Sequence, residues 1–211
     1  NISHDILNEF VRSKLNMMPD RLIEIEKTAQ KKGIPIVSRE VSRLLTILTA
    51  IKKPDRILEI GTAVGYSTIS MHLGYPQAEI ITIEMDFDMV MQARQNIKMV
   101  GALDRIKIIG GEAEEVLSAI EGKFDMIFFD AAKAQYIDYL NLTKDKMAKE
   151  CLLVCDNVLF KGMVVGRKYL KRRMITIAKR MNKLIKMLEE DDEFIVTLLP
   201  VSDGILMALK K

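Results

Sequence analysis

The run ILEIGTAVGYSTI, residues 57–69, joins a short β-rich segment to a glycine turn and the start of a helix. Gly61 directly follows the apolar residues, and Gly65 comes four positions later. Two glycines at this place allow a tight turn from strand to helix and a close approach between the backbone and a ligand. The run therefore predicts one strand, turn and helix of an α/β sheet, with a ligand beside the turn.

Short β-rich segments alternate with helical ones from Pro54 onward. We expect parallel strands at residues 56–60, 79–84, 105–109, 124–130 and 150–156. The helices predicted between them, as right-handed crossovers, cover residues 64–74, 87–100, 112–120 and 135–149. The last two β-rich segments, 194–199 and 204–209, are joined by only four residues and predict an antiparallel hairpin. The predicted fold class is α/β, a Rossmann-like, doubly wound sheet of seven strands with the last one reversed.

The first part of the chain has the periodicity of helices. From residue 3 to about residue 52 apolar side chains recur at intervals of three and four, which predicts three helices. Ser38 is expected to cap the third of them. Because no Gly/Ser-rich linker or internal repeat divides the 211 residues, we predict one domain, with a helical cap at 1–52 and an α/β core at 53–211.

The composition is that of a folded protein without membrane spans. Hydrophobic residues make up 49% and charged residues 29% of the chain. The longest apolar runs, 151–155 and 205–209, are far shorter than the roughly 20 residues of a membrane-spanning helix. The first residues lack the pattern of a signal peptide, so the expectation is a cytoplasmic enzyme. Cys151 and Cys155 are expected in a buried strand, and with two histidines in the chain no zinc site is expected.

Acidic side chains stand at the ends of three predicted strands. Glu84 lies 23 residues after Gly61, where an acid can accept hydrogen bonds from both hydroxyls of a ribose. Asp130 ends the fourth strand, and Asp156 with Asn157 ends the fifth. Since the carboxyl ends of parallel strands meet at one edge, two carboxylates and an amide oxygen would suit a hard cation such as Mg²⁺, Mn²⁺ or Ca²⁺. Helix capping and turn formation are the alternative roles for these residues.

The glycine turn lacks the third glycine of a G-x-G-x-x-G pattern, which disfavours a dinucleotide-dependent dehydrogenase. Four segments in order, ILEIGTAVGYSTI, ITIEM, FFDAAKAQY and CDNVLFKG, instead resemble the metal-dependent class I S-adenosylmethionine O-methyltransferases of the catechol and caffeoyl-CoA type. The match covers about residues 34–162, with the terminal hairpin in register. The resemblance implies an S-adenosylmethionine cofactor, a divalent metal ion and a homodimer.

The resemblance also implies roles for individual residues. The metal ligands would be Asp130, Asp156 and Asn157. The catalytic residues would be Asp130 and Lys133, the lysine acting as a base or as an electrostatic helper, although a solvated lysine is the alternative. The cofactor would contact Val37 (through its main chain), Gly61, Ser67, Glu84, Glu112, Ala113 and Asp130.

Two features disfavour a small catechol as the substrate. Ala131 and Ala132 stand where the catechol enzymes carry bulky ring residues that help to wall a small aromatic molecule. The chain also has no tryptophan, and Phe10 is the only aromatic residue of the N-terminal helical segment. The two alanines indicate a more open pocket, and the scarcity of aromatic residues does not favour a catechol.

Positive charge is concentrated in one segment of the chain. Between Asp156 and Glu189 there are 10 Lys or Arg residues and no acid, so the rest of the chain has a net charge of −7. An apolar stripe from Leu170 to Leu188 predicts a helix here. Its other face would carry Arg167, Lys168, Lys171, Arg172, Arg173, Lys179, Arg180, Lys183 and Lys186. Such a face suits the phosphates of RNA, and a solvated helix face is the alternative interpretation.

The segments NVLFKG, before this helix, and PVSDGI, in the terminal hairpin, resemble the bacterial tRNA 5-hydroxyuridine methyltransferases of the same family. 5-Hydroxyuridine carries a hydroxyl beside its 4-carbonyl, a chelating pair of oxygens like that of a catechol. The hypothesis is therefore an enzyme that converts 5-hydroxyuridine at the tRNA wobble position to 5-methoxyuridine. A small catechol or other phenolic substrate is the first alternative, and a non-catalytic RNA-binding module is the second.

Overall fold

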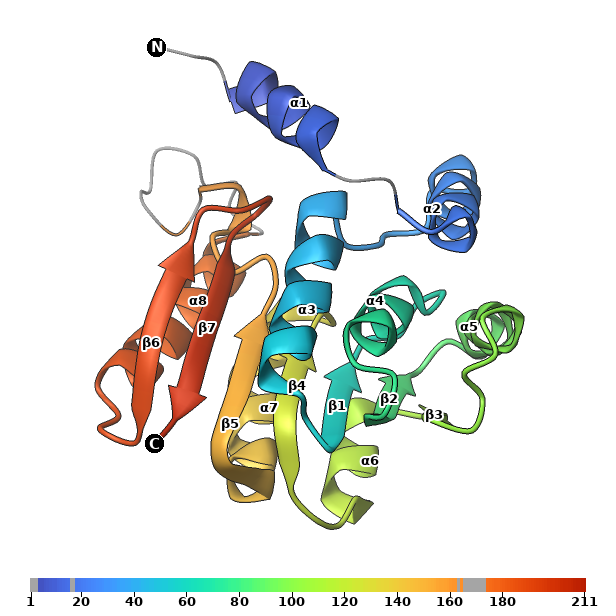
Figure 1. Ribbon diagram of the computed structural model, residues 1–211. Coiled ribbons are helices and arrows are strands. Elements are labelled where there is room, and N and C mark those ends of the chain that lie inside the picture. Colours follow the sequence, from blue (N-terminus) through green and yellow to red (C-terminus); the bar gives the residue numbers. More distant parts are fainter. Residues whose placement is uncertain (1–3, 16–17, 163, 165–173) are drawn as a thin grey trace.

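The computed structural model describes residues 4–15, 18–162, 164 and 174–211 (Figure 1). Its centre is a seven-stranded sheet in the order β3-β2-β1-β4-β5-β7-β6. The strands are β1 (Arg56–Ile60), β2 (Glu79–Glu84), β3 (Ile106–Gly110), β4 (Phe124–Phe129), β5 (Met147–Cys155), β6 (Phe194–Leu199) and β7 (Ile205–Lys210). Strands β1 to β5 pair in parallel, whereas β7 is antiparallel to both of its neighbours, β5 and β6. The predicted sheet and its reversed last strand are confirmed.

Helices cover both faces of this sheet. They are α1 (His4–Lys14), α2 (Asp20–Lys32), α3 (Arg39–Lys52), α4 (Tyr66–Gly74), α5 (Phe87–Met99), α6 (Ala113–Ala119), α7 (Tyr136–Thr143) and α8 (Ile175–Glu189). Short 3₁₀ turns are η1 (Lys133–Gln135), η2 (Lys144–Lys146) and η3 (Phe160–Gly162). Ser38 caps α3 as predicted, since its hydroxyl accepts a hydrogen bond from the amide of Val41 at 3.4 Å.

Each face of the sheet buries its own apolar core, because successive residues of a strand point to opposite faces. On one face Ile57 and Phe128 pack with apolar residues of α2, α3, α4 and α5. On the other face Leu58 and Phe129 pack with residues of α6, α7 and α8. The inner strands are therefore apolar on both sides, as a parallel sheet covered by helices requires.

The predicted helix at 135–149 is wrong in its second half. Helix α7 ends at Thr143, and β5 begins at Met147, three residues before the predicted strand. Met147 is buried and pairs with Phe124, whereas Glu150 has a φ of 58° within an irregularity of the β4–β5 pairing. This bulge exposes polar residues, which explains why the sequence pattern hid the early start of the strand.

The other predicted strand and crossover-helix boundaries lie within two residues of the observed ones, whereas the predicted start of the last helix, near Leu170, lies outside the described residues. The largest of these shifts is at α4, because Gly65 adopts a left-handed conformation (φ 82°) and caps a helix that begins at Tyr66. Strand β4 ends at Phe129 and β5 at Cys155. Asp130 and Asp156 are therefore the first residues after their strands.

The predicted placement of the two cysteines in a buried strand is confirmed. Cys151 and Cys155 are free thiols buried in β5. Among the described residues, no helix is both long enough and apolar enough to cross a lipid bilayer.

Candidate active site

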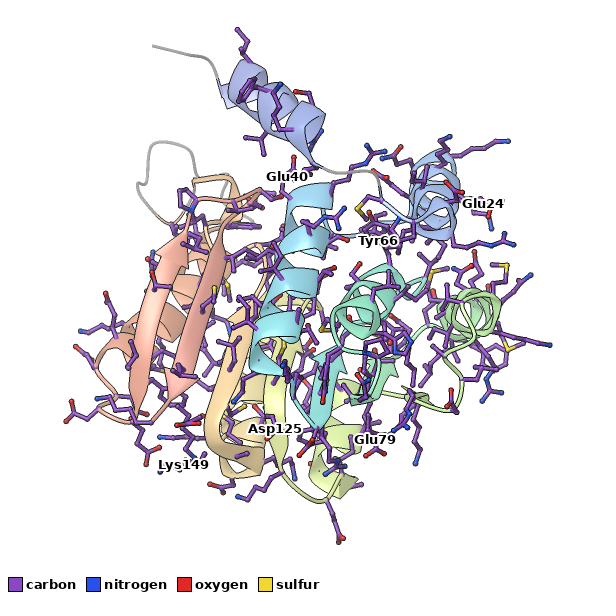
Figure 2. All side chains as sticks on the ribbon, in the orientation of Figure 1. Glu24, Glu40, Tyr66, Glu79, Asp125 and Lys149 are labelled. Carbon is purple, nitrogen blue, oxygen red and sulfur yellow. The ribbon has the colours of Figure 1, made fainter. Side chains whose placement is uncertain are left out.

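Residues predicted to bind ligands gather at the edge of the sheet where β1, β2, β4 and β5 end. In Figure 2, Glu79 and Asp125 mark the opposite edge, where β2 and β4 begin. Hydrogen bonds join the strand ends: the amide of Asp130 donates to the last carbonyl of β1 at 2.9 Å, and the amide of Asp156 to the last carbonyl of β4 at 3.0 Å. The topology thus brings three neighbouring strand ends together, as predicted.

Gly61 packs closely against the backbone of the residue that follows β4. Its φ of 100° is one that residues with a side chain rarely adopt. A Cβ atom at this position would lie 2.7 Å from the carbonyl carbon of Asp130 and closer still to the oxygen. Only glycine therefore lets the turn that follows β1 pack against Asp130.

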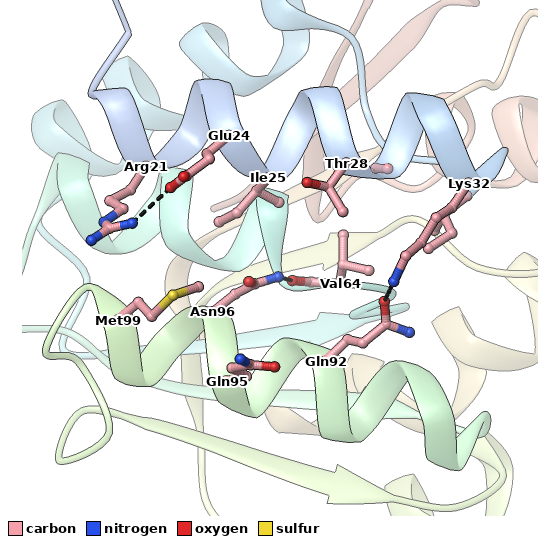
Figure 3. A pocket seen from close by; sticks show the side chains of 12 residues that line it. Arg21, Glu24, Ile25, Thr28, Lys32, Val64, Gln92, Gln95, Asn96 and Met99 are labelled. Atoms are coloured by element: carbon pink, nitrogen blue, oxygen red, sulfur yellow. Dashed lines mark hydrogen bonds and ion pairs between the residues drawn. The ribbon is translucent and has the colours of Figure 1, made fainter.

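The turn is anchored to α5 by Asn96. The side-chain amide of Asn96 donates to the carbonyl of Val64 at 2.8 Å. Both residues line a cavity of about 290 Å³ between α2 and α5, bridged on one side by a hydrogen bond from Lys32 to Gln92 (Figure 3). None of the predicted site residues that the structure describes lines this cavity. Asn96 was not predicted as part of the site, and no local sequence signal marks it.

The helical cap reaches the turn through Val37. This residue lies in the loop between α2 and α3 and is buried. Its side chain belongs to the same apolar core as Val64 of the glycine turn. The loop of Val37, whose main chain is a predicted cofactor contact, is thus anchored in the core that also includes the glycine turn.

Glu59 is a fully buried carboxylate inside β1, next to the turn. Its oxygens accept hydrogen bonds from the hydroxyls of Ser67 at 2.6 Å, of Thr82 at 2.7 Å and of Thr68. Burial raises the pKa of Glu59 to about 7, and the three hydroxyl hydrogen bonds oppose the rise. Glu59 thereby fixes Ser67, a predicted cofactor residue, in the first turn of α4. The prediction did not include Glu59, although an acid within an apolar strand is a signal of a buried polar network.

Glu84 ends β2 and holds the glycine turn. Its Oε2 accepts a hydrogen bond from the amide of Ala63 at 2.8 Å, and its Oε1 accepts one from the amide of Asp86 at 2.9 Å. A carboxylate has further lone pairs, so both oxygens can also accept the predicted ribose hydroxyls. The first amide after β3 donates to the carbonyl of Glu84 at 2.9 Å, and Glu112 and Ala113 come next, the first exposed and the second buried.

Asp130 and Asp156 form the charged part of the site. Burial raises the pKa of Asp130 well above its ordinary value, and the charge of Asp156 raises it further. Burial also raises the pKa of Asp156 to about 6, although its Oδ1 accepts a hydrogen bond from the amide of Asn157 at 2.6 Å. The Lys133 ammonium lowers the pKa of both aspartates. The three charged side chains therefore lie close enough to interact.

Two carboxylates that disfavour each other's charge are a suitable place for a cation, which would remove the repulsion. Within the described part of the chain, no group of three or more His, Cys, Asp or Glu residues is placed to hold a metal ion. The predicted set is of another kind, because its third donor is the amide oxygen of Asn157, which follows Asp156 in a left-handed turn with a φ of 60°. These oxygen donors fit a hard divalent cation that keeps some of its water.

The amino-acid sequence matches a known family over nearly its whole length. Residues 13–211 fit the sequence model of the family described as O-methyltransferase. The chain belongs to the O-methyltransferase family. Its reaction class is therefore the transfer of a methyl group to an oxygen atom.

Two relatives and one solved structure resemble this O-methyltransferase over most of its length. An O-methyltransferase from Aspergillus hancockii is 32% identical over 180 residues, which are 72% of this chain and 71% of the relative. A catechol O-methyltransferase from Niastella koreensis is 28% identical and covers 97% of this chain and 96% of its own. The SAH-bound crystal structure of a Podospora anserina methyltransferase has a TM-score of 0.89 at 30% identity, covering 98% of this chain and 94% of that one.

The basic segment of this O-methyltransferase is described in part. Outside the described residues lie Arg167, Lys168, Lys171, Arg172 and Arg173. In α8 the predicted apolar stripe is confirmed at Met181 and Leu188, which are buried. Lys179 is exposed, whereas Arg180 forms an ion pair with Asp138 of α7. Lys179 therefore presents its charge to solvent, whereas the charge of Arg180 is paired with that of Asp138.

Proposed function

We propose that this enzyme transfers the methyl group of S-adenosylmethionine to a substrate oxygen, with a divalent cation held by Asp130, Asp156 and Asn157. One observation carries the proposal: two carboxylates with raised pKa values follow adjacent strands, directly beside a glycine turn. The Podospora anserina methyltransferase is SAH-bound, which supports the same cofactor for this chain. The glycine turn and Glu84 would hold that cofactor.

The cofactor side of the site would supply alignment. Methyl transfer is an in-line displacement, in which the substrate oxygen attacks the methyl carbon while the sulfur leaves as a neutral thioether. Gly61 allows the backbone to approach the cofactor, Glu84 would accept its ribose hydroxyls, and Glu59 fixes Ser67. Well-oriented reactants can gain about 7–11 kcal/mol from such positioning.

The other side of the site would supply charge. When bound, a divalent cation stabilises the anion of the substrate hydroxyl. Lys133 interacts electrostatically with both aspartates, so it lies at the same place. As a neutral amine, Lys133 would take the hydroxyl proton, and as an ammonium it would stabilise the oxyanion. Asp130 and Asp156, at the ends of their strands, would orient both the cation and Lys133.

We propose 5-hydroxyuridine at the tRNA wobble position as the substrate. Its hydroxyl and 4-carbonyl supply two adjacent oxygens for a cation. The 10 basic residues between Asp156 and Glu189 follow directly after the proposed metal ligands, and Lys179 is exposed among them. Ala131 and Ala132 have small side chains beside Asp130, which would leave room for a nucleotide within a larger RNA.

A small catechol is the second candidate substrate. It offers the same pair of adjacent oxygens, and the relative from Niastella koreensis, which covers 97% of this chain, is a catechol O-methyltransferase. The small side chains of Ala131 and Ala132 and the positive charge of the basic segment disfavour this candidate.

One experiment separates these candidates. The enzyme is incubated with S-adenosylmethionine and, in parallel, with hydroxylated tRNA, unmodified tRNA and a set of catechols, and the products are identified by mass spectrometry. The proposal predicts 5-methoxyuridine from hydroxylated tRNA and none from unmodified tRNA. Methylated catechol without any methylated nucleoside would replace the RNA substrate with a small phenol. RNA binding without any turnover would indicate a binding module instead.

A further inference from the structure

Tyr136 is a buried aromatic residue placed between the two proposed metal-binding strand ends. It is the first residue of α7, three positions after Lys133, and it has no exposed surface. Its ring packs edge-on against Phe129, the last residue of β4, with 5.6 Å between the ring centres. A phenylalanine could fill this space equally well, so the hydroxyl group needs its own explanation.

The hydroxyl of Tyr136 contacts both strand ends at once. Its oxygen lies 3.0 Å from the carbonyl oxygen of Phe129 and 3.2 Å from the carbonyl oxygen of Asp156. Carbonyl oxygens only accept, so the phenol is the donor in both contacts, and its single hydrogen is shared between them. The two acceptors are seven and 20 residues away in sequence and lie at the ends of two different strands.

These two carbonyls belong to the peptides that set the positions of the proposed ligands. The carbonyl of Phe129 is in the peptide that leads into Asp130, and the carbonyl of Asp156 is in the peptide that leads into Asn157. The carbonyl of Phe129 also accepts the amide of Asp156 at 3.0 Å. From within the apolar core, the hydroxyl of Tyr136 therefore links the backbone beside Asp130 to the backbone between Asp156 and Asn157.

We propose that Tyr136 is a positioning residue, whose hydroxyl fixes the spacing between Asp130 and the Asp156–Asn157 pair. The inference rests on the proposed divalent cation and adds a residue that does not touch it. Groups that orient metal ligands without binding the metal typically contribute about 10- to 100-fold to metal affinity. Loss of the hydroxyl is expected to weaken cation binding within this range, while the aromatic packing and the fold are retained.

The test compares two variants that each lose one phenol hydroxyl from α7. Tyr136→Phe removes the bridge. Tyr139→Phe is the matched control, because Tyr139 is also buried and also packs against Phe129, at 5.8 Å, but its hydroxyl donates to the side chain of Gln135 at 2.9 Å. The full-length wild type and both variants, without cofactor or substrate, are titrated with Mn²⁺ and followed by calorimetry and by the electron paramagnetic resonance of the free ion.

The inference predicts that Tyr136→Phe binds Mn²⁺ about 10- to 100-fold more weakly than the wild type, and that Tyr139→Phe binds it like the wild type. Equal affinity of Tyr136→Phe and wild type would overturn the inference and leave the proposed cation in place. Equal losses in both variants would also overturn it, since they would reflect general packing. A wild type that binds no Mn²⁺ would overturn the proposed cation, and the inference with it.

A third variant restores a donor at the same place. p-Aminophenylalanine incorporated at position 136 keeps the ring and replaces the hydroxyl with an N–H donor. Recovery of Mn²⁺ affinity in this variant supports a hydrogen-bonding role, and affinity as low as that of Tyr136→Phe contradicts it. The same variant decides the question if Tyr136→Phe does not fold.

Discussion

The carboxyl edge of the sheet has two halves: a proposed cofactor half, with the glycine turn, Glu59 and Glu84, and a proposed cation half, with Asp130, Asp156 and Asn157. The buried carboxylates of the two halves have different surroundings. In the cofactor half, Glu59 accepts hydrogen bonds from three hydroxyl groups, two of them on α4 and one on β2. In the cation half, among the described residues, the structure records a single amide donor for the carboxylate of Asp156 and none for that of Asp130. Lys133 is the cation that lowers the pKa of both aspartates.

This difference separates a carboxylate that the protein satisfies from two that it leaves largely unsatisfied. Three hydroxyl groups donate to Glu59, so this buried side chain has its partners within the protein. The two aspartates keep most of their acceptor capacity, and the charge of Asp156 raises the pKa of Asp130, so a positive ligand would stabilise their charged forms.

Loss of a carboxylate in the cation half should abolish the reaction without harming the cofactor half. In Asp156→Ala we expect kcat to fall on the order of 1,000-fold, because a metal that stabilises the charge of a transition state contributes several kcal/mol. Burial already disfavours the charge of Asp156, so the variant should fold, and its S-adenosylmethionine affinity, measured by calorimetry, should be unchanged. Asp192→Ala, at an exposed position, is the control. Undiminished kcat in Asp156→Ala would exclude the proposed ligand role.

A side chain at the contact between the two halves should damage both. In Gly61→Ala the new methyl group would collide with the backbone of Asp130, and displacements of about 1 Å in a site can cost about 100-fold in rate. Gly101→Ala is a matched control, because Gly101 also has a positive φ, 73°, but a Cβ there meets no atom within 4 Å. It should lose only about 1–3 kcal/mol of unfolding free energy, and no activity. Similar kcat/KM values for the two variants would mean that the contact at Gly61 is unimportant.

An acid in the cofactor half should affect binding more than chemistry. Glu84→Ala is expected to weaken S-adenosylmethionine binding by about 1–3 kcal/mol, the range for a lost charged hydrogen bond. Glu79→Ala is its control at the other end of β2, where the side chain is exposed and pairs with Arg56. Calorimetric titration of both variants measures the effect, and equal cofactor affinities would remove Glu84 from the cofactor site.

The cation half should also respond to pH. The pKa of Asp156, raised to about 6, means that a proton competes with the cation below this pH, so Mn²⁺ affinity should fall by about fivefold from pH 6 to pH 5. The folded protein keeps this proton at pH values where the unfolded chain, with a pKa of 3.8, has lost it. Without a cation, Asp156 therefore lowers the unfolding free energy as pH rises from about 4 to 6. Calorimetry at several pH values, with and without Mn²⁺, measures both effects, and an affinity independent of pH would contradict them.

The smallest effect is expected at the surface of α8. Lys179→Ser should weaken tRNA binding modestly and reduce the slope of log affinity against log salt by about 1, since one phosphate contact is lost. Lys98→Ser removes the same charge from α5, whose apolar side packs on the other face of the sheet, and should change neither quantity. Filter binding at several salt concentrations measures both variants. If Lys179→Ser and Lys98→Ser showed the same slope of log affinity against log salt, Lys179 would be a solvated side chain without a phosphate contact.

Local patterns in the sequence were sufficient for most of the fold. The strands, the glycine turn and the acids after Phe129 and Cys155 were predicted because apolar runs, glycines and strand ends are visible over a few residues. The early start of β5 at Met147 was missed, because its place in the sheet depends on pairing with Phe124 across a bulge.

The supporting residues of the site were harder to predict, because their roles depend on contacts between distant parts of the chain. Asn96 holds a carbonyl 32 residues away, and Tyr136 contacts two strands that meet only in the folded protein. Glu59 was visible within its motif, but its three hydroxyl partners come from two other elements.

The central claim is that the aspartates at the ends of β4 and β5 hold a divalent cation needed for methyl transfer. The most direct test is the initial rate of methyl transfer to hydroxylated tRNA and to a catechol, measured after removal of metals with a chelator and again after addition of Mg²⁺ or Mn²⁺. Chelation is expected to stop the reaction on whichever substrate is used, and the added cation is expected to restore it. An unchanged rate in the thoroughly chelated enzyme would contradict the claim.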